Sequence, residues 1–127
     1  MVEDLSKHKM ESEQMMIDTA ASANINKALE QRKKVCAVGT TVMRSLETSV
    51  STKNMVIPYE GWTNIFIFPP YDFKIASCML TNFHLPKSSL MMQVSAFSGY
   101  ELLMKAYKEG VKKKYKFHTF GDAMLIL

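Results

Sequence analysis

Two stretches of the chain combine polar side chains with the expected start of a helix. In the first, VGTTVMRSLE, Gly39 lets the backbone turn tightly off a strand, and Thr40 and Thr41 follow at the helix N-terminus. Such an N-terminus favours anions, so a carboxylate or phosphate could be held between this turn and Arg44, one turn further on. The alternative is a threonine cap with a surface pair between Arg44 and Glu47. The chain has neither GxGxxG nor GxxxxGK[ST], so nothing supports a dinucleotide or P-loop site.

The second stretch, TNFHLPKSSL, places polar side chains where a buried strand should end. Residues 77–80 are the apolar end of that strand, and Thr81, Asn82 and His84 follow it. Asn82 and His84 would project to the same side, since side chains alternate along a strand. Pro86 ends the strand and prepares the next helix. Because open α/β sheets bind ligands at such strand ends, we expect the two corners to face a common hollow.

Other titratable residues lie near expected element ends. They include His8 and Glu13 in the segment HKMESE, and Asp122 after a glycine near the C-terminus. Asp122 could equally be a turn residue, and His84 could simply bond a backbone carbonyl. The three histidines are scattered without ligand spacing, so the sequence predicts no metal site.

Length and composition set the broad class. At 127 residues, with 47% hydrophobic residues, the chain has the size and core of one domain, 1–127. The net charge of +4 permits an anionic partner such as tRNA without demanding one. No apolar run could span a bilayer and no signal-peptide core is present, so we expect a cytoplasmic protein without membrane contact. Cys36 and Cys78 lie in expected buried strands and are predicted to be reduced, packed thiols.

The expected elements alternate between strands and helices, which predicts an α/β fold. Residues 10–17 are a short strand, and Asp18 or Thr19 caps a helix to about Arg32. A buried strand (35–38), a helix (42–50), a loop (54–62) and a strand (64–68, NIFIF) follow, which together predict a parallel βαβ unit.

The C-terminal half should contain two helices and a last strand. Ser88 or Ser89 caps the first helix, Gly99 breaks it, and the second helix runs from Tyr100 to about Lys114. One face of the second helix carries apolar residues up to Val111. The tail AMLIL reads as a strand that must be paired or covered.

Three ordered motifs match a known enzyme family. AVGTTVMRSLE, TNFHLPKSSLMMQVSAFSGYELLMKAY and YKFHTFGDAMLI closely resemble the C-terminal part of the S-adenosylmethionine:tRNA ribosyltransferase-isomerases of queuosine biosynthesis. HKMESE is similar to that family's HxMHSE segment, so the resemblance runs from His8 to Ile126. Family members are longer, with a small β-barrel inserted into a large mixed α/β domain. The resemblance implies that this chain is the last part of the large domain, without the barrel.

The resemblance also implies a reaction. The ribosyl group of S-adenosylmethionine, the co-substrate, is transferred to 7-aminomethyl-7-deazaguanine at the tRNA wobble position and isomerised to epoxyqueuosine. Adenine and methionine are released, and no metal or further cofactor is implied. A base must remove a proton acidified by the sulfonium, the methionine carboxylate needs a cation, and the target base must leave its stack.

Each candidate residue can be given a role in this implied reaction from the chemistry of its side chain. Thr40, Thr41 and Arg44, with Glu47 beside them, would hold the anion. Asn82 and His84 would contact sugar or base. The candidates for proton transfer are Glu13, His84 and Asp122.

The chain departs from the family pattern at several positions. Glu11 stands where histidine is usual, Ser89 for threonine, Gly110 for alanine, Lys116 for arginine, and HTF where an SY-like pair precedes GDAM. If the usual histidine is an acid or base, this chain lacks it; if it orients a neighbour, the loss is smaller.

Two further expectations concern the chain by itself. Because it is shorter than family members, we expect no turnover of S-adenosylmethionine by the chain alone. We also expect an exposed sheet edge that binds an N-terminal partner chain or a second copy. The alternative is a non-catalytic remnant or tRNA-binding module that uses Lys108, Lys112, Lys114 and Lys116.

Overall fold

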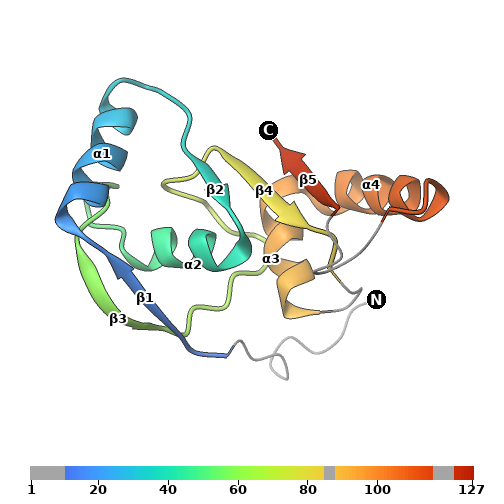
Figure 1. Ribbon diagram of the computed structural model, residues 1–127, viewed down its shortest axis with the longest axis horizontal. Coiled ribbons are helices and arrows are strands. Elements are labelled where there is room, and N and C mark those ends of the chain that lie inside the picture. The colour runs from blue at the N-terminus through green and yellow to red at the C-terminus, as the bar shows by residue number, and fades with distance from the viewer. Residues whose placement is uncertain (1–10, 85–87, 116–121) are drawn as a thin grey trace.

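Helix α2 (Thr40–Thr48) lies at the centre of the fold and contacts both of its sheets (Figure 1). The computed structural model describes residues 11–84, 88–115 and 122–127. The expected positions His8, Pro86, Lys116 and Gly121 lie outside that part. Helix α2 starts at Thr40, directly after Gly39, whose φ of +99° is a conformation that glycine adopts readily. The strand therefore turns straight into the helix, as predicted.

Two sheets flank this helix. One is the antiparallel pair of β1 (Glu13–Ile17) and β3 (Tyr59–Thr63). The other contains β2 (Cys36–Val38), β4 (Cys78–Asn82) and β5 (Ala123–Ile126) in the order β2-β4-β5. Strand β4 is parallel to β2 and antiparallel to β5. The fold is thus mixed α/β, as predicted, and the last strand is paired.

Three more helices complete the described part of the fold. Helix α1 (Thr19–Glu30) starts at Asp18, whose carboxylate accepts a hydrogen bond from the Ala21 N–H at 2.7 Å. Ser88 caps α3 (Ser89–Ser98) in the same way. Gly99, at φ +88°, separates α3 from α4 (Tyr100–Lys112). In Figure 1, α1 lies beside the β1–β3 pair at one end, while α4 lies beside β5 at the other.

The prediction of a strand at residues 64–68 is wrong. These residues are irregular, and the preceding segment, predicted as a loop, forms β3 instead. The side chain of Ile67 is 1% exposed, so the apolar run is buried as expected but without a strand partner. One reason lies in the Ile65 carbonyl, which accepts a hydrogen bond from Arg44 Nε at 3.1 Å rather than from a neighbouring strand. The parallel partner of β2 is therefore β4.

Two expected burials are also wrong. Strand β2 lies at the edge of its sheet, and its side chains alternate between the two faces. Cys36 and Val38 are exposed on one face, whereas Ala37 is buried on the other. Val111, expected on the apolar face of α4, is 67% exposed. The core lies on the opposite face of β2, where Ala37 and Met79 are fully buried together with Met43 of α2.

Within the described residues, every helix lacks the length and apolarity that a membrane span requires. The same part of the chain contains no cluster of three or more His, Cys, Asp or Glu side chains that could hold a metal ion.

Candidate functional site

A hollow of about 350 Å³ lies where β2 and β4 end and α2 begins. Four residues predicted for the site, Thr40, Thr41, Asn82 and His84, line it together. The remaining lining residues are Val38, Gly39, Val42, Leu80, Thr81 and Ala123. Two motifs about forty residues apart in the chain therefore meet at one surface, because β2 and β4 are parallel neighbours and end at the same edge of the sheet.

The N-terminus of α2 forms one wall of this hollow and carries no side-chain cap. The expected threonine cap is wrong, because the Thr41 hydroxyl donates instead to Glu13 Oε2 at 2.8 Å. The first-turn N–H groups of the helix, with the positive end of its dipole, are left to interact with a ligand. This wall can hold a carboxylate or phosphate.

Glu13 does not line the hollow itself, but it contacts Thr41, which does, and it also contacts Arg44. Its second oxygen, Oε1, accepts a hydrogen bond from Arg44 Nη1 at 2.5 Å. The Glu13 side chain is 35% exposed, whereas that of Arg44 is fully buried. Strand β1 and helix α2 thus fix the position of one carboxylate next to the hollow from two sides.

Arg44 does not line the hollow. Its guanidinium donates to Glu13 and to the backbone carbonyls of Glu11, at 3.0 Å, and Ile65. The alternative of a surface pair between Arg44 and Glu47 is wrong, since both residues are buried and have other partners. Glu11 takes part here through its backbone carbonyl, and its side chain is exposed.

His84 forms part of the opposite wall. Its Nε2 is 2.9 Å from the hydroxyl oxygen of Thr81, and its backbone N–H donates to the Tyr107 hydroxyl at 2.6 Å. Burial raises the pKa of Tyr107, while the hydrogen bond from His84 lowers it. Thr81 of β4 thus contacts the ring, while Tyr107 of α4 holds the backbone of His84. Asn82 beside it is exposed and accessible to a ligand.

Glu47, predicted to help bind substrate, lies away from the hollow. Its carboxylate accepts hydrogen bonds from the backbone N–H groups of Lys74 and Ile75, at 3.1 and 3.2 Å. Burial raises the pKa of Glu47, and these hydrogen bonds oppose the rise. Burial and the nearby Glu47 charge raise the pKa of Tyr71 to about 12. Glu47 therefore anchors the segment 71–75 to α2.

Asp122 immediately precedes β5. It is half-buried, and its neighbour Ala123 lines the hollow while Asp122 itself does not. The structure brings this carboxyl group to the same edge of the sheet as Asn82, the register partner of Ala123.

Gln93 is a structural contributor that the sequence reasoning missed. Its Nε2 donates to the carbonyl of Thr40 at 2.9 Å, and the residue is 1% exposed. It therefore ties α3 to the first turn of α2. The available signal was a single amide in the otherwise apolar run LMMQVSAF, where a buried polar group needs a partner.

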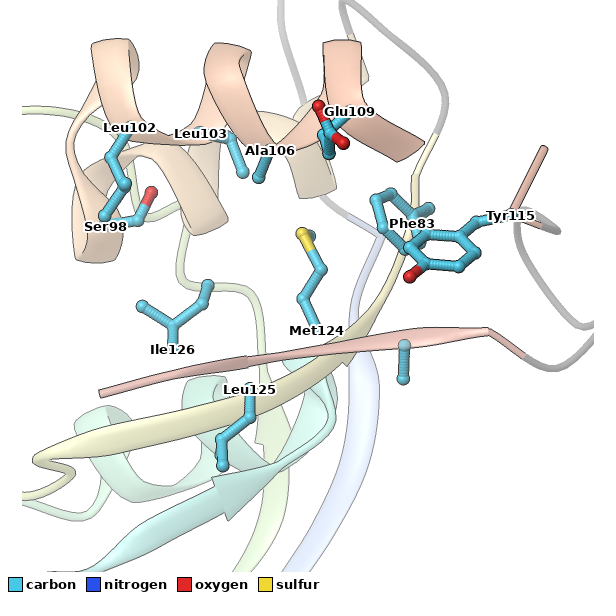
Figure 2. Close-up of a pocket in the computed structure, with 11 residues that line it drawn as sticks. Phe83, Ser98, Leu102, Leu103, Ala106, Glu109, Tyr115, Met124, Leu125 and Ile126 are labelled. Atoms are coloured by element: carbon cyan, nitrogen blue, oxygen red, sulfur yellow. The ribbon is translucent and has the colours of Figure 1, made fainter. Parts of the chain in front are cut away.

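A second hollow, of about 360 Å³, lies between α4 and β5. Figure 2 shows Met124 and Ile126 pointing toward α4, where Leu103 and Ala106 face them, while Leu125 points away. Its lining is mainly apolar and includes none of the predicted site residues. The hollow at the end of β2 and β4 is therefore the candidate site.

Comparison with known proteins identifies relatives. Residues 1–126 match the family described as queuosine biosynthesis protein. The chain is 58% identical over 126 residues to the S-adenosylmethionine:tRNA ribosyltransferase-isomerase of Flavobacterium psychrophilum, and 59% identical to that of Cytophaga hutchinsonii. Each alignment covers 99% of this chain and 36% of the relative, so the chain spans little more than a third of the relatives' length.

A solved structure supports the same relationship. The chain resembles the S-adenosylmethionine tRNA ribosyltransferase of Thermotoga maritima with a TM-score of 0.82 and 43% sequence identity. The match covers 88% of this chain and 39% of that one, as expected for a partial domain. Together with the family match over residues 1–126, these findings confirm the resemblance inferred from the three motifs: the chain belongs to the queuosine biosynthesis protein family.

Proposed function

We propose that this chain supplies part of the active site of an S-adenosylmethionine-dependent tRNA ribosyltransferase-isomerase. The reaction would transfer and isomerise the ribosyl group of S-adenosylmethionine onto 7-aminomethyl-7-deazaguanine in tRNA, giving epoxyqueuosine. The observation that carries the proposal is the convergence of Thr40, Thr41, Asn82 and His84 on one hollow. The names and identities of the relatives support it independently.

The methionine carboxylate would bind at the N-terminus of α2. Thr40 and Thr41 line the hollow there, and the uncapped first turn offers backbone N–H donors. Arg44 would act as a positioning residue, because its buried guanidinium holds Glu13 rather than a ligand. Glu47 would likewise act indirectly, by holding the segment 71–75 against α2.

The sugar and base would lie toward the other wall, near Asn82 and His84. The candidates for proton transfer remain Glu13, which contacts Thr41, His84 in the wall of the hollow, and Asp122 beside Ala123. Of these, Glu13 has an orientation fixed by two partners and a side chain that is one-third exposed, which suits a base that must reach a substrate. We assign it the removal of the proton next to the sulfonium.

The macromolecular partner in this proposal is tRNA carrying the queuosine precursor base. With that substrate, the activity belongs in the cytoplasm. The relatives' names and the family description support tRNA as the substrate class.

A chimeric enzyme tests the proposal. Residues 1–126 of this chain would replace the matching segment of the Flavobacterium psychrophilum relative, to which they are 58% identical. The chimera should release adenine from S-adenosylmethionine when given tRNA bearing the precursor base, whereas this chain alone should not. A folded chimera that binds this tRNA but releases no adenine would favour a non-catalytic binding module.

Matched variants of the chimera would locate the site. Asn82→Ala removes an exposed amide from the polar hollow and should lower kcat/KM by about tenfold or more, the loss of at least one substrate hydrogen bond. Leu125→Ala changes an exposed side chain at the apolar hollow and should leave kcat/KM within about twofold. Equal losses in both variants would contradict the assignment of the site.

A further inference from the structure

The two cysteines of the chain are register partners on adjacent strands. Cys36 of β2 is paired with Cys78 of β4 in the parallel ladder, so both side chains project to the same face of the sheet. Cys36 is exposed, whereas Cys78 is 6% exposed. An accessible thiol thus lies directly beside a shielded one.

The spacing suits a disulfide. Neighbouring strands lie about 4.8 Å apart, and Cα atoms joined through a disulfide are typically about 4.4–6.8 Å apart. The two thiols also affect each other. Partial desolvation raises the pKa of Cys36, and the neighbouring Cys78 raises it further through a hydrogen bond and its charge, so the reactive Cys36 thiolate forms only at alkaline pH.

A metal site is the weaker interpretation. Within the described residues, no third His, Cys, Asp or Glu joins the pair to complete a set of ligands. Two thiols without further ligands are instead the minimum needed for reversible two-electron oxidation.

We propose that Cys36 and Cys78 form a peroxide-sensitive dithiol that closes to a disulfide between β2 and β4. The exposed Cys36, as its thiolate, attacks one oxygen of hydrogen peroxide, which breaks the O–O bond and leaves a sulfenic acid and hydroxide; the hydroxide takes the proton that the thiol had released to solvent and becomes water. The sulfur of Cys78 then attacks the sulfur of Cys36 and releases a second water. Overall, two thiols are oxidised and one peroxide is reduced to two waters, with one S–S bond formed.

The position of this pair gives the disulfide a structural effect. Strand β2 leads into Gly39 and strand β4 leads into Asn82, so the same two strands carry both walls of the polar hollow. A covalent link between them would fix their register. The proposal itself needs no assignment of substrate, so its failure would leave the proposed function unaffected.

Mass spectrometry of the purified, fully reduced chain tests the proposal. After treatment with hydrogen peroxide at mildly alkaline pH, the chain should lose the mass of two hydrogen atoms and take up no iodoacetamide once denatured. Dithiothreitol should restore both alkylation sites. Peptide mapping should find Cys36 and Cys78 linked within one chain.

Single serine variants provide the matched controls. With Cys78→Ser, the sulfenic acid on Cys36 has no internal partner, so dimedone should label it about tenfold more than in the unmodified chain. Cys36→Ser should leave Cys78 unlabelled, because that thiol is shielded. A disulfide linking two chains, further oxidation of Cys36 with Cys78 still free, or equal dimedone labelling with and without Cys78 would overturn the proposal.

Discussion

The polar hollow at the end of β2 and β4 and the apolar hollow between α4 and β5 are almost equal in volume, about 350 and 360 Å³, yet their walls are built differently. The polar hollow depends on hydrogen bonds to buried ionisable groups behind it, such as the one from Arg44 to Glu13. The apolar hollow is walled by packed side chains, with the Phe83 ring 5.2 Å from that of Tyr107. Volume alone therefore does not identify a site; the polar groups and the contacts that support them do.

Consecutive residues separate the two hollows. Phe83 lines the apolar hollow and His84 lines the polar one, while Ala123 of β5 borders both. The end of β4 thus serves as a partition, with a packed ring on one side and an imidazole on the other. We expect substitutions on the polar side to respond to charge and pH, and those on the apolar side to respond to volume.

The largest effect should follow Arg44→Leu. The change leaves Glu13 without its charge partner and removes the donors to the carbonyls of Glu11 and Ile65. Leaving a part-buried hydrogen-bonding group without its donor costs about 1–3 kcal/mol, so with three such groups affected the free energy of unfolding should fall by about 3 kcal/mol or more, which urea denaturation would measure. As a control, Arg32→Leu replaces the other arginine of the chain, which is exposed, and should change the free energy of unfolding by less than about 0.5 kcal/mol. Similar losses in both variants would contradict the role given to Arg44.

Glu47→Gln should change the pH dependence of stability on the polar side. Burial raises the pKa of Glu47 in the folded state, so this state binds a proton more readily than the unfolded chain does. Its contribution to stability is therefore present below the ordinary glutamate pKa and is lost as pH rises through the raised value. Unfolding free energies measured across that range should show the unmodified chain losing stability relative to Glu47→Gln as pH rises. A constant difference would refute this.

Ala106→Leu should stabilise the chain by about 1 kcal/mol. The added carbons would enter the apolar hollow, and part of their burial energy is offset by lost side-chain entropy. The gain should not vary with pH, since no ionisable group is changed. Ala23→Leu on the exposed face of α1 is the control and should have an effect below about 0.5 kcal/mol. A destabilised Ala106→Leu would mean that the hollow cannot accept the added volume.

The smallest effect should come from Gly110→Ala. Alanine is favoured over glycine inside a helix by about 1 kcal/mol. A Cβ at position 110 would, however, lie 2.8 Å from Cε1 of Phe83, so the ring must shift. We expect these effects to cancel within about 1 kcal/mol in urea denaturation. A loss above about 2 kcal/mol would show that the ring is held more rigidly than this balance assumes.

Local features of the fold could be predicted from the sequence. Asp18, Ser88 and Gly99 mark helix ends through hydrogen bonds or backbone angles that involve only near neighbours. Strand pairing could not be predicted in the same way. The segment Tyr59–Thr63 contains a glycine and follows a proline, both turn signals, yet it pairs with β1 because of contacts made more than forty residues away.

The same difference between local and long-range features holds for the candidate site. Thr40, Thr41, Asn82 and His84 could be placed because strand ends and helix starts are visible in the sequence. The partner of Arg44 could not, because Glu13 is 31 residues away on another element. Residue type indicated what Arg44 could bind, but only the packing of β1 against α2 decided which carboxylate it binds.

The connection from β2 to β4 has a consequence for how the molecule is assembled during synthesis. The bond from the Val35 N–H to the Ser77 hydroxyl joins residues 42 positions apart, and β4 must be present before β2 has a neighbour at all. Until the ribosome has added β4, strand β2 is unpaired and the turn at Gly39 forms only one side of the polar hollow. The two walls of the polar hollow can therefore meet only after residues 78–82 have emerged from the exit tunnel and β4 has paired with β2.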